Sequence, residues 1–115
     1  MLLQEVNQAV TSVGDYEYLL MSQQWPTTVC MSGGCAKKKI GKVFGIHGLW
    51  PTNTTKPYPQ FCSNDPRDAY QQMPKALESQ LHMQWPTLFK GKDEVFWEKE
   101  WIKHGTCSLN KFSQI

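Results

Sequence analysis

The chain has 115 residues and a formal net charge of +2, with 12 Lys and Arg against 10 Asp and Glu. This length fits one domain with a single hydrophobic core, and five Trp, five Phe and four Tyr indicate a globular protein rather than a disordered one. So small a charge argues against a protein that coats nucleic acid non-specifically, although it does not exclude RNA as a substrate, and no apolar run approaches the length of a membrane span.

The N-terminal third predicts one strand between less regular segments. Residues 1–14 are a short helix or a ragged tail, and residues 1–11 show no apolar run of signal-peptide length. Residues 16–25 are rich in aromatic and apolar side chains and predict a mostly buried strand that stops at Pro26. The lysine run at 37–39 lies in a loop, where a solvated surface is the main interpretation and RNA steering the lesser one.

A second strand is predicted at residues 43–50, with the sequence VFGIHGLW. Alternation places Phe44 and Ile46 on one face and Val43, His47 and Leu49 on the other. The glycines on both sides of the imidazole remove side chains there, which we expect to open space for a ligand. Residues 51–67 contain four prolines and predict a long loop.

Two helices are predicted in the last third. Met73, Leu77, Leu81 and Trp85 recur at a spacing of four, which predicts a core-packing helix near residues 74–84, with Pro74 in its first turn. A second helix is predicted near residues 94–104, with Asp93 as its N-cap and Gly105 as its C-terminal stop. The strands and helices together predict an α+β fold, an antiparallel sheet packed with helices, as a single domain over residues 1–115.

The four cysteines, at positions 30, 35, 62 and 107, predict two disulfides and an oxidising compartment. Counting alone allows three pairings, and zinc binding is the competing interpretation, although the sequence has no CxxC motif. The tripeptide Asn53-Thr54-Thr55 is an acceptor pattern for N-glycosylation and adds weight to secretion.

The candidate chemistry lies in two segments. Glu100 and His104 share one helix face, and Lys103 flanks it. A solvated helix face with a C-capping histidine is the simplest interpretation of that helix alone, and its dipole would favour an imidazolium at His104. The second histidine, His47, completes a set that can move protons around an anion. Such a set suits phosphodiester transfer with an internal 2′-hydroxyl nucleophile and no metal.

The segments FGIHGLWP at 44–51 and FWEKEWIKHGTC at 96–107 resemble the two active-site signatures of the ribonuclease T2 family, and the resemblance extends to QQWP at 23–26. The sequon after the first signature resembles the plant branch, which includes the S-RNases and S-like enzymes. The resemblance covers roughly residues 15–112, and because family members are much longer, it implies the N-terminal, active-site part of a ribonuclease T2-like fold.

The resemblance also implies roles for individual residues. His104 matches the general base and His47 the general acid, while Glu100 and Lys103 match the pair that stabilises pentacoordinate phosphorus. Trp50 lies against the phosphate pocket. The positions that match the family's base-binding residues are Gln24, Thr87, Phe89 and Phe96. The matches of Thr87 and Phe89 rest on spacing alone. Lys99 stands where many members carry a third histidine that assists substrate binding. The implied disulfides are Cys30–Cys35 and Cys62–Cys107.

The sequence therefore predicts a secreted, monomeric endoribonuclease that cleaves single-stranded RNA to a 2′,3′-cyclic phosphate and then to a 3′-phosphate, without cofactor or metal. The alternative is a non-catalytic RNA-binding or recognition fragment. A small disulfide-rich module of the storage or defence kind explains the His-Glu-Lys-His set least well.

Overall fold

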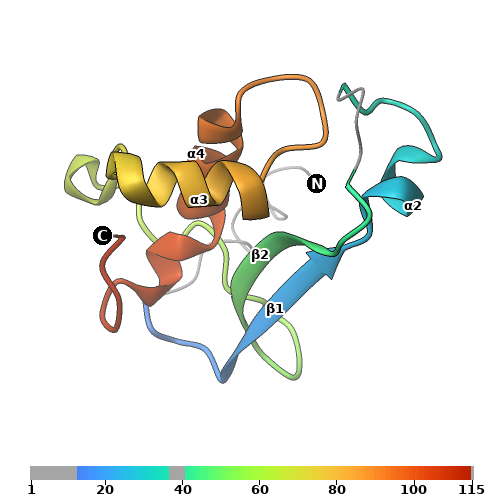
Figure 1. Ribbon diagram of the computed structural model, residues 1–115. Helices are drawn as coiled ribbons and strands as arrows, with labels where there is room; N and C mark the ends of the chain where they lie inside the picture. Colours follow the sequence, from blue (N-terminus) through green and yellow to red (C-terminus); the bar gives the residue numbers. More distant parts are fainter. Residues whose placement is uncertain (1–12, 37–40, 115) are drawn as a thin grey trace.

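The computed structural model describes residues 13–36 and 41–114. The helix or tail expected at residues 1–14 and the lysine run at 37–39 fall wholly or mostly outside these ranges. Within them, two strands form an antiparallel ribbon, and two longer helices lie over the opposite part of the molecule (Figure 1). The fold is α+β, as the sequence predicts.

The sheet consists of β1 (Tyr18–Gln24) and β2 (Gly45–Thr52). The short helix α2 (Pro26–Cys30) follows β1, since Pro26 at its first position fixes a helical φ and lacks the N–H that a strand would need. The prediction that the first strand is mostly buried is wrong, because Leu20 is 45% and Met21 53% exposed. A two-stranded sheet covers little of its own surface, and no other described element packs over these side chains closely enough to bury them.

The helix α3 (Lys75–Gln84) lies where the sequence predicts a helix, but its apolar stripe is not buried in a core. None of its residues is buried, Leu77 is 39% exposed, and Leu81 is half-buried. The helix contacts its neighbour mainly through its C-terminal end, where the indole of Trp85 stacks on Trp97 with ring centroids 6.3 Å apart. Pro74 is the N-cap rather than part of the first turn.

The helix α4 (Asp93–Lys103) differs from the prediction at both ends. Lys92, not Asp93, is the N-cap, and Asp93 is the first helical residue. Its carboxylate accepts a hydrogen bond from the backbone N–H of Thr87 (2.8 Å), which holds the preceding loop against the helix start. Gly105 does not stop the chain's helical course, because the 3₁₀ helix η2 (Gly105–Ser108) follows directly. A second 3₁₀ helix, η1 (Pro66–Asp68), interrupts the predicted long loop.

The core of the described residues is small and lies beneath α4. Trp97 is 1% exposed and donates its indole N–H to the carbonyl oxygen of Trp85 (2.7 Å), while Leu88 and Cys107 are also buried. No helix among the described residues has the length and apolar character needed to cross a membrane.

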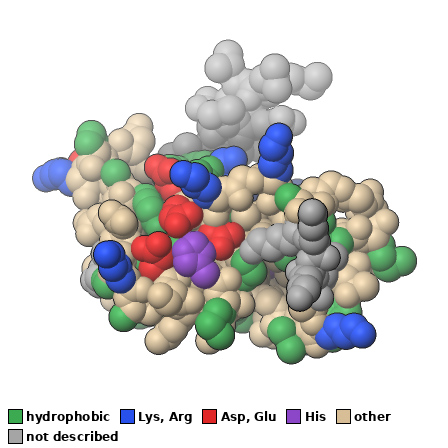
Figure 2. Space-filling model, turned by 45° about the horizontal axis from the view of Figure 1, so that its top comes forward, with side chains coloured by type: hydrophobic (Ala, Val, Ile, Leu, Met, Phe, Trp, Pro, Cys, Tyr) green, Lys and Arg blue, Asp and Glu red, His purple; other side chains and the backbone are tan. Residues whose placement is uncertain are grey.

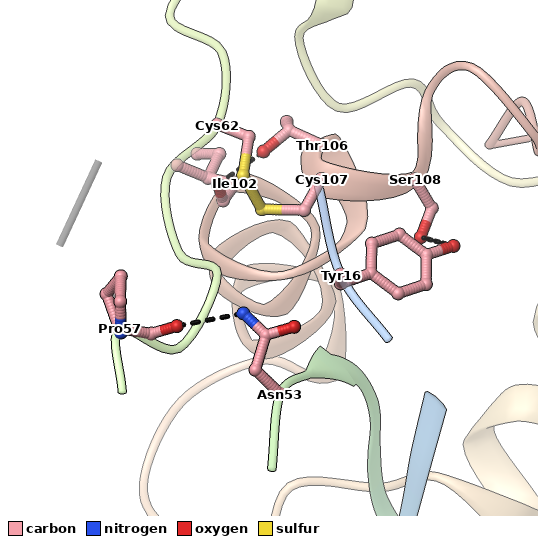
Figure 3. The surroundings of a disulfide bond; sticks show 8 residues. All are labelled: Tyr16, Asn53, Pro57, Cys62, Ile102, Thr106, Cys107 and Ser108. Atoms are coloured by element: carbon pink, nitrogen blue, oxygen red, sulfur yellow. Dashed lines mark hydrogen bonds between the residues drawn. A yellow bond between two sulfur atoms is a disulfide. The ribbon is translucent and has the colours of Figure 1, made fainter. Parts of the chain in front are cut away.

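Both implied disulfides are confirmed. Cys30 pairs with Cys35 at a Cα separation of 5.4 Å, and Cys62 pairs with Cys107 at 4.9 Å. The second bridge ties the loop after β2 to η2, directly beyond the end of α4 (Figure 3). Because all four cysteines are paired, the zinc interpretation of these cysteines is wrong.

Candidate active site

His47 lies at an irregularity of β2. Ser22 pairs with Gly48 and Gln23 pairs with Ile46, so that the register shifts and His47 has no partner on β1. One extra residue on a strand is a β-bulge, and a bulge turns the following side chains relative to strict alternation. It brings the imidazole of His47 beside the indole of Trp50, with ring centroids 5.1 Å apart. Alternation alone would place positions 47 and 50 on opposite faces.

The indole of Trp50 links the strand to α4. Its Nε1–H donates a hydrogen bond to Oε2 of Glu100 (2.9 Å). Gly48 makes this approach possible, because a Cβ atom there would lie 2.3 Å from Trp50 Nε1 and 2.9 Å from Glu100 Oε2. The space left by Gly48 is therefore filled by Trp50 and Glu100, which corrects the expectation that both flanking glycines open room for a ligand.

The end of α4 supplies three functional groups. Glu100 and His104 lie one turn apart, with 4.0 Å between Oε2 and Nε2, and Lys103 lines the same pocket. The ring of His104 faces Trp50 at 5.1 Å between centroids, so the indole lies against both imidazoles. The side chains of His104 and Glu100 are only 12% and 15% exposed.

Burial decides the protonation of His104. Desolvation, together with the nearby positive charges of Lys103 and His47, lowers the pKa of His104 to about 4. The helix dipole was expected to favour an imidazolium at His104, and that expectation is wrong, because burial of the ring outweighs the dipole. The ring of His104 is consequently neutral at neutral pH, as a general base must be before it accepts a proton.

A pocket of about 510 Å³ brings these groups together. The four residues predicted to be catalytic and Trp50 all line it. Its remaining walls are contributed by β1, by the end of β2 and by the loop that follows, namely by Tyr18, Leu20, Pro51, Thr52, Asn53, Thr54, Tyr58, Pro59 and Gln60. Sequence reasoning missed the tyrosines of this wall, since neither lies in a motif.

The residues expected to hold a base do not line this pocket. Phe96 contacts a residue of the pocket lining, with its ring 6.4 Å from that of His47 on one side and 5.7 Å from that of Trp85 on the other. Gln24 ends β1, and Phe89 is 51% exposed beside the Cys30–Cys35 loop. The hydroxyl of the buried Thr87 accepts a hydrogen bond from the backbone N–H of Phe89 (3.3 Å).

Lys99 lies exposed on α4 and outside the pocket lining.

Asn53, the predicted glycosylation site, is part of the pocket wall. Its Nδ2 donates a hydrogen bond to the carbonyl oxygen of Pro57 (2.9 Å; Figure 3), and its Oδ1 accepts one from the backbone N–H of Glu17 (3.0 Å). The carboxylate of Glu17 in turn accepts a hydrogen bond from the hydroxyl of Thr54 (2.7 Å). These bonds join the loop after β2 to the segment that leads into β1.

The architecture and the pocket together define an α+β protein, stabilised by disulfides, in which two histidines, a glutamate and a lysine converge on one cavity. The sequence model of the Ribonuclease T2 family matches residues 16–114, and the chain belongs to that family.

Named relatives show the same relationship. Ribonuclease DdI of Dictyostelium discoideum is 42% identical over 96 residues, which are 84% of this chain and 42% of that protein. Ribonuclease S-3 of Pyrus pyrifolia is 39% identical (84% of this chain, 43% of that protein), and the extracellular ribonuclease LE of Solanum lycopersicum is 41% identical (82% and 43%). The chain thus spans less than half the length of these relatives.

Solved structures agree in fold. The Japanese pear S3-RNase superposes with a TM-score of 0.70 at 39% identity, covering 80% of this chain and 46% of that one. A mutant of RNase MC1 in complex with 5′-GMP gives a TM-score of 0.68 at 35% identity, covering 87% and 52%.

Proposed function

We propose that this chain carries the active site of an endoribonuclease that cleaves single-stranded RNA by transphosphorylation. The observation that supports this most strongly is the placement of His47 and His104 against one indole, beside Glu100 and Lys103, in a single open pocket. Two imidazoles around one cavity are what an internal displacement at phosphorus needs, since one must accept a proton while the other donates one.

The proposed reaction has two steps. Neutral His104 accepts the proton of a ribose 2′-hydroxyl, whose oxygen attacks phosphorus, while protonated His47 donates a proton to the departing 5′-oxygen. This forms a 2′,3′-cyclic phosphate. Water then opens the ring with the two roles reversed and leaves a 3′-phosphate.

The charge that develops on phosphorus needs fixed partners. Lys103 supplies the cation, and Glu100, held by the Trp50 hydrogen bond, positions the network around the phosphoryl oxygens. Binding of Trp50 to Glu100 also fixes the wall on which the phosphate rests, so that no rearrangement is required when charge appears.

RNA binding involves two regions. Tyr58, 44% exposed on the pocket wall, offers a ring face on which an unpaired base can stack. Gln24, Thr87, Phe89 and Phe96 serve the base on the other side of the scissile bond, since Phe96 continues the aromatic surface beyond His47. Lys99 contributes electrostatic binding rather than chemistry. The relative solved with 5′-GMP supports a nucleotide ligand for this fold.

The protein is proposed to be a secreted, monomeric glycoprotein. Two disulfides fit an oxidising compartment, and one relative is named an extracellular ribonuclease. Asn53 is compatible with a glycan, because its Nδ2 carries two hydrogens and the bond to Pro57 uses one of them.

The test is cleavage of a single-stranded oligoribonucleotide in the presence of EDTA, with the products identified by mass spectrometry. The expected product is a 2′,3′-cyclic phosphate, and a matched substrate with a single 2′-deoxyribose at the scissile position should remain intact. Cleavage of the deoxy substrate, or cleavage only with added metal, would refute the proposed mechanism. RNA binding without cleavage would instead favour the recognition fragment.

A further inference from the structure

A second group of titratable side chains lies outside the active-site pocket, where α3 meets the first turn of α4. The space-filling view shows acidic side chains gathered around one histidine on one face of the molecule (Figure 2). In the structure His82 of α3 lies among Glu78, from the same helix, and Asp93 and Glu94, from α4. None of these residues lines the pocket of His47 and His104.

The distances from one imidazole nitrogen to two carboxylate oxygens match the donor spacing of a metal coordination shell. Nε2 of His82 lies 3.5 Å from Oε1 of Glu78 and 3.5 Å from Oε1 of Glu94, and one donor atom from each residue falls within 4.8 Å of the others. A tetrahedral zinc ion with bonds of about 2.0–2.2 Å separates neighbouring donors by about 3.4 Å. A direct charge-assisted hydrogen bond would draw nitrogen and oxygen closer, to about 2.7–2.9 Å.

The imidazole is oriented from its other side. Nδ1 of His82 lies 2.6 Å from Oδ2 of Asp93, whose side chain is only 10% exposed and whose second oxygen accepts the Thr87 N–H. The ring also contacts the buried indole of Trp97, with centroids 5.0 Å apart. A carboxylate on the far nitrogen fixes the tautomer that leaves Nε2 free to bind a metal, as it does for most metal-bound histidines.

We propose that Glu78, His82 and Glu94 form a zinc site that joins α3 to the start of α4. Two glutamates and one neutral imidazole supply three ligands, and the exposure of His82 and Glu94, 41% each, leaves the fourth position to water. The mixed nitrogen and oxygen donors favour Zn²⁺ over Mg²⁺ or Ca²⁺, which prefer oxygen alone. The site takes no part in the proposed RNA chemistry, which the sequence predicts to proceed without metal.

The competing explanation is an imidazolium held by three carboxylates. The hydrogen bond to Asp93, with further contributions from Glu78 and Glu94, raises the pKa of His82. Proton and metal therefore compete for Nε2, and zinc binding should weaken as the pH falls through that raised pKa.

The test is isothermal titration calorimetry of the chain with ZnCl₂, above the pKa of His82, on the wild type and matched variants. We expect one zinc ion on this site, and H82Q, E78Q and E94Q should each weaken binding by at least about tenfold, as should D93N, which removes the orienting carboxylate. E98Q is the control, because Glu98 is an exposed acid one turn further along α4, and it should change the affinity less than about twofold.

A parallel titration of the His104→Ala variant distinguishes zinc bound at the proposed site from zinc bound by the active-site histidines. Retention of the zinc affinity in this variant supports the proposed site, and its loss there, with H82Q unaffected, would overturn it. Equal weakening by E98Q and E94Q, or no binding to the wild type, would mean that the carboxylates hold only a proton on His82. Circular dichroism of each variant checks that the helices remain folded. Because the readout is binding, its failure leaves the proposed RNA cleavage untouched.

Discussion

Substitution of Gly48 by alanine should disable the active site while leaving the chain folded. The new Cβ would lie 2.3 Å from Nε1 of Trp50 and 2.9 Å from Oε2 of Glu100. An ordinary contact between such atoms needs about 3.5 Å, so the indole must move by about 1 Å and its hydrogen bond to Glu100 must break. Overpacking of this kind costs about 1–3 kcal/mol of stability.

The larger effect should be on catalysis. The indole lies against both His47 and His104, and a misplacement of about 1 Å in catalytic geometry lowers rates on the order of 100-fold. The assay is the initial rate of dinucleotide cleavage, with thermal unfolding measured on the same samples. Gly45→Ala is the matched control on the same strand, because a Cβ there meets only the carbonyl oxygen of Gln84 at 3.9 Å. Equal activity of the two variants would refute the argument that Gly48 is required by the Trp50–Glu100 contact.

Three further predictions follow from the site and the disulfides. The low pKa of His104 should place the rising limb of the kcat/KM profile near pH 4, and a rising limb near pH 6.5 would contradict the burial argument. Because the folded-state pKa lies below the ordinary 6.5, the contribution of the neutral His104 ring to the free energy of unfolding should be fully present above pH 6.5 and should be lost as the pH falls towards 4. Replacing Cys62 and Cys107 by serine should lower the free energy of unfolding by about 4 kcal/mol, since this bridge closes a loop with a sequence separation of 45. The Cys30–Cys35 bridge closes a much shorter loop, so urea denaturation should show a smaller loss, about 2 kcal/mol, when that pair is replaced. Lys99→Ala should raise KM with little change in kcat, and a kcat loss as large as that of a histidine variant would mean that this lysine reaches the reacting atoms.

The sequence predicts the elements of this fold better than their burial. Both strands and both long helices fall within about two residues of their expected positions, and prolines mark the limits of two of them, Pro26 after β1 and Pro74 and Pro86 on either side of α3. Burial depends on what packs against an element, and neither the β1 face nor the Leu77 stripe is covered within the described residues. Periodicity identifies an apolar face but not the element that covers it.

The candidate site shows the same division. The residues predicted to be catalytic follow from two motifs, and all of them line one pocket. The bulge at His47, by contrast, arises from the pairing with β1, and the role of Gly48 arises from the contact between Trp50 and Glu100, which are 50 residues apart in sequence. The tyrosines of the pocket wall and the zinc site proposed at Glu78, His82 and Glu94 also depend on tertiary packing, which local patterns do not encode.

The most direct test of the proposed acid–base chemistry is the turnover of His47→Ala and His104→Ala on a single-stranded RNA substrate. The expected result is that each variant loses most of its turnover, by roughly 100-fold or more, with unfolding temperatures close to that of the unmodified protein. Turnover retained after removal of either imidazole would contradict the assignment of His104 as base and His47 as acid, and with it the proposed function.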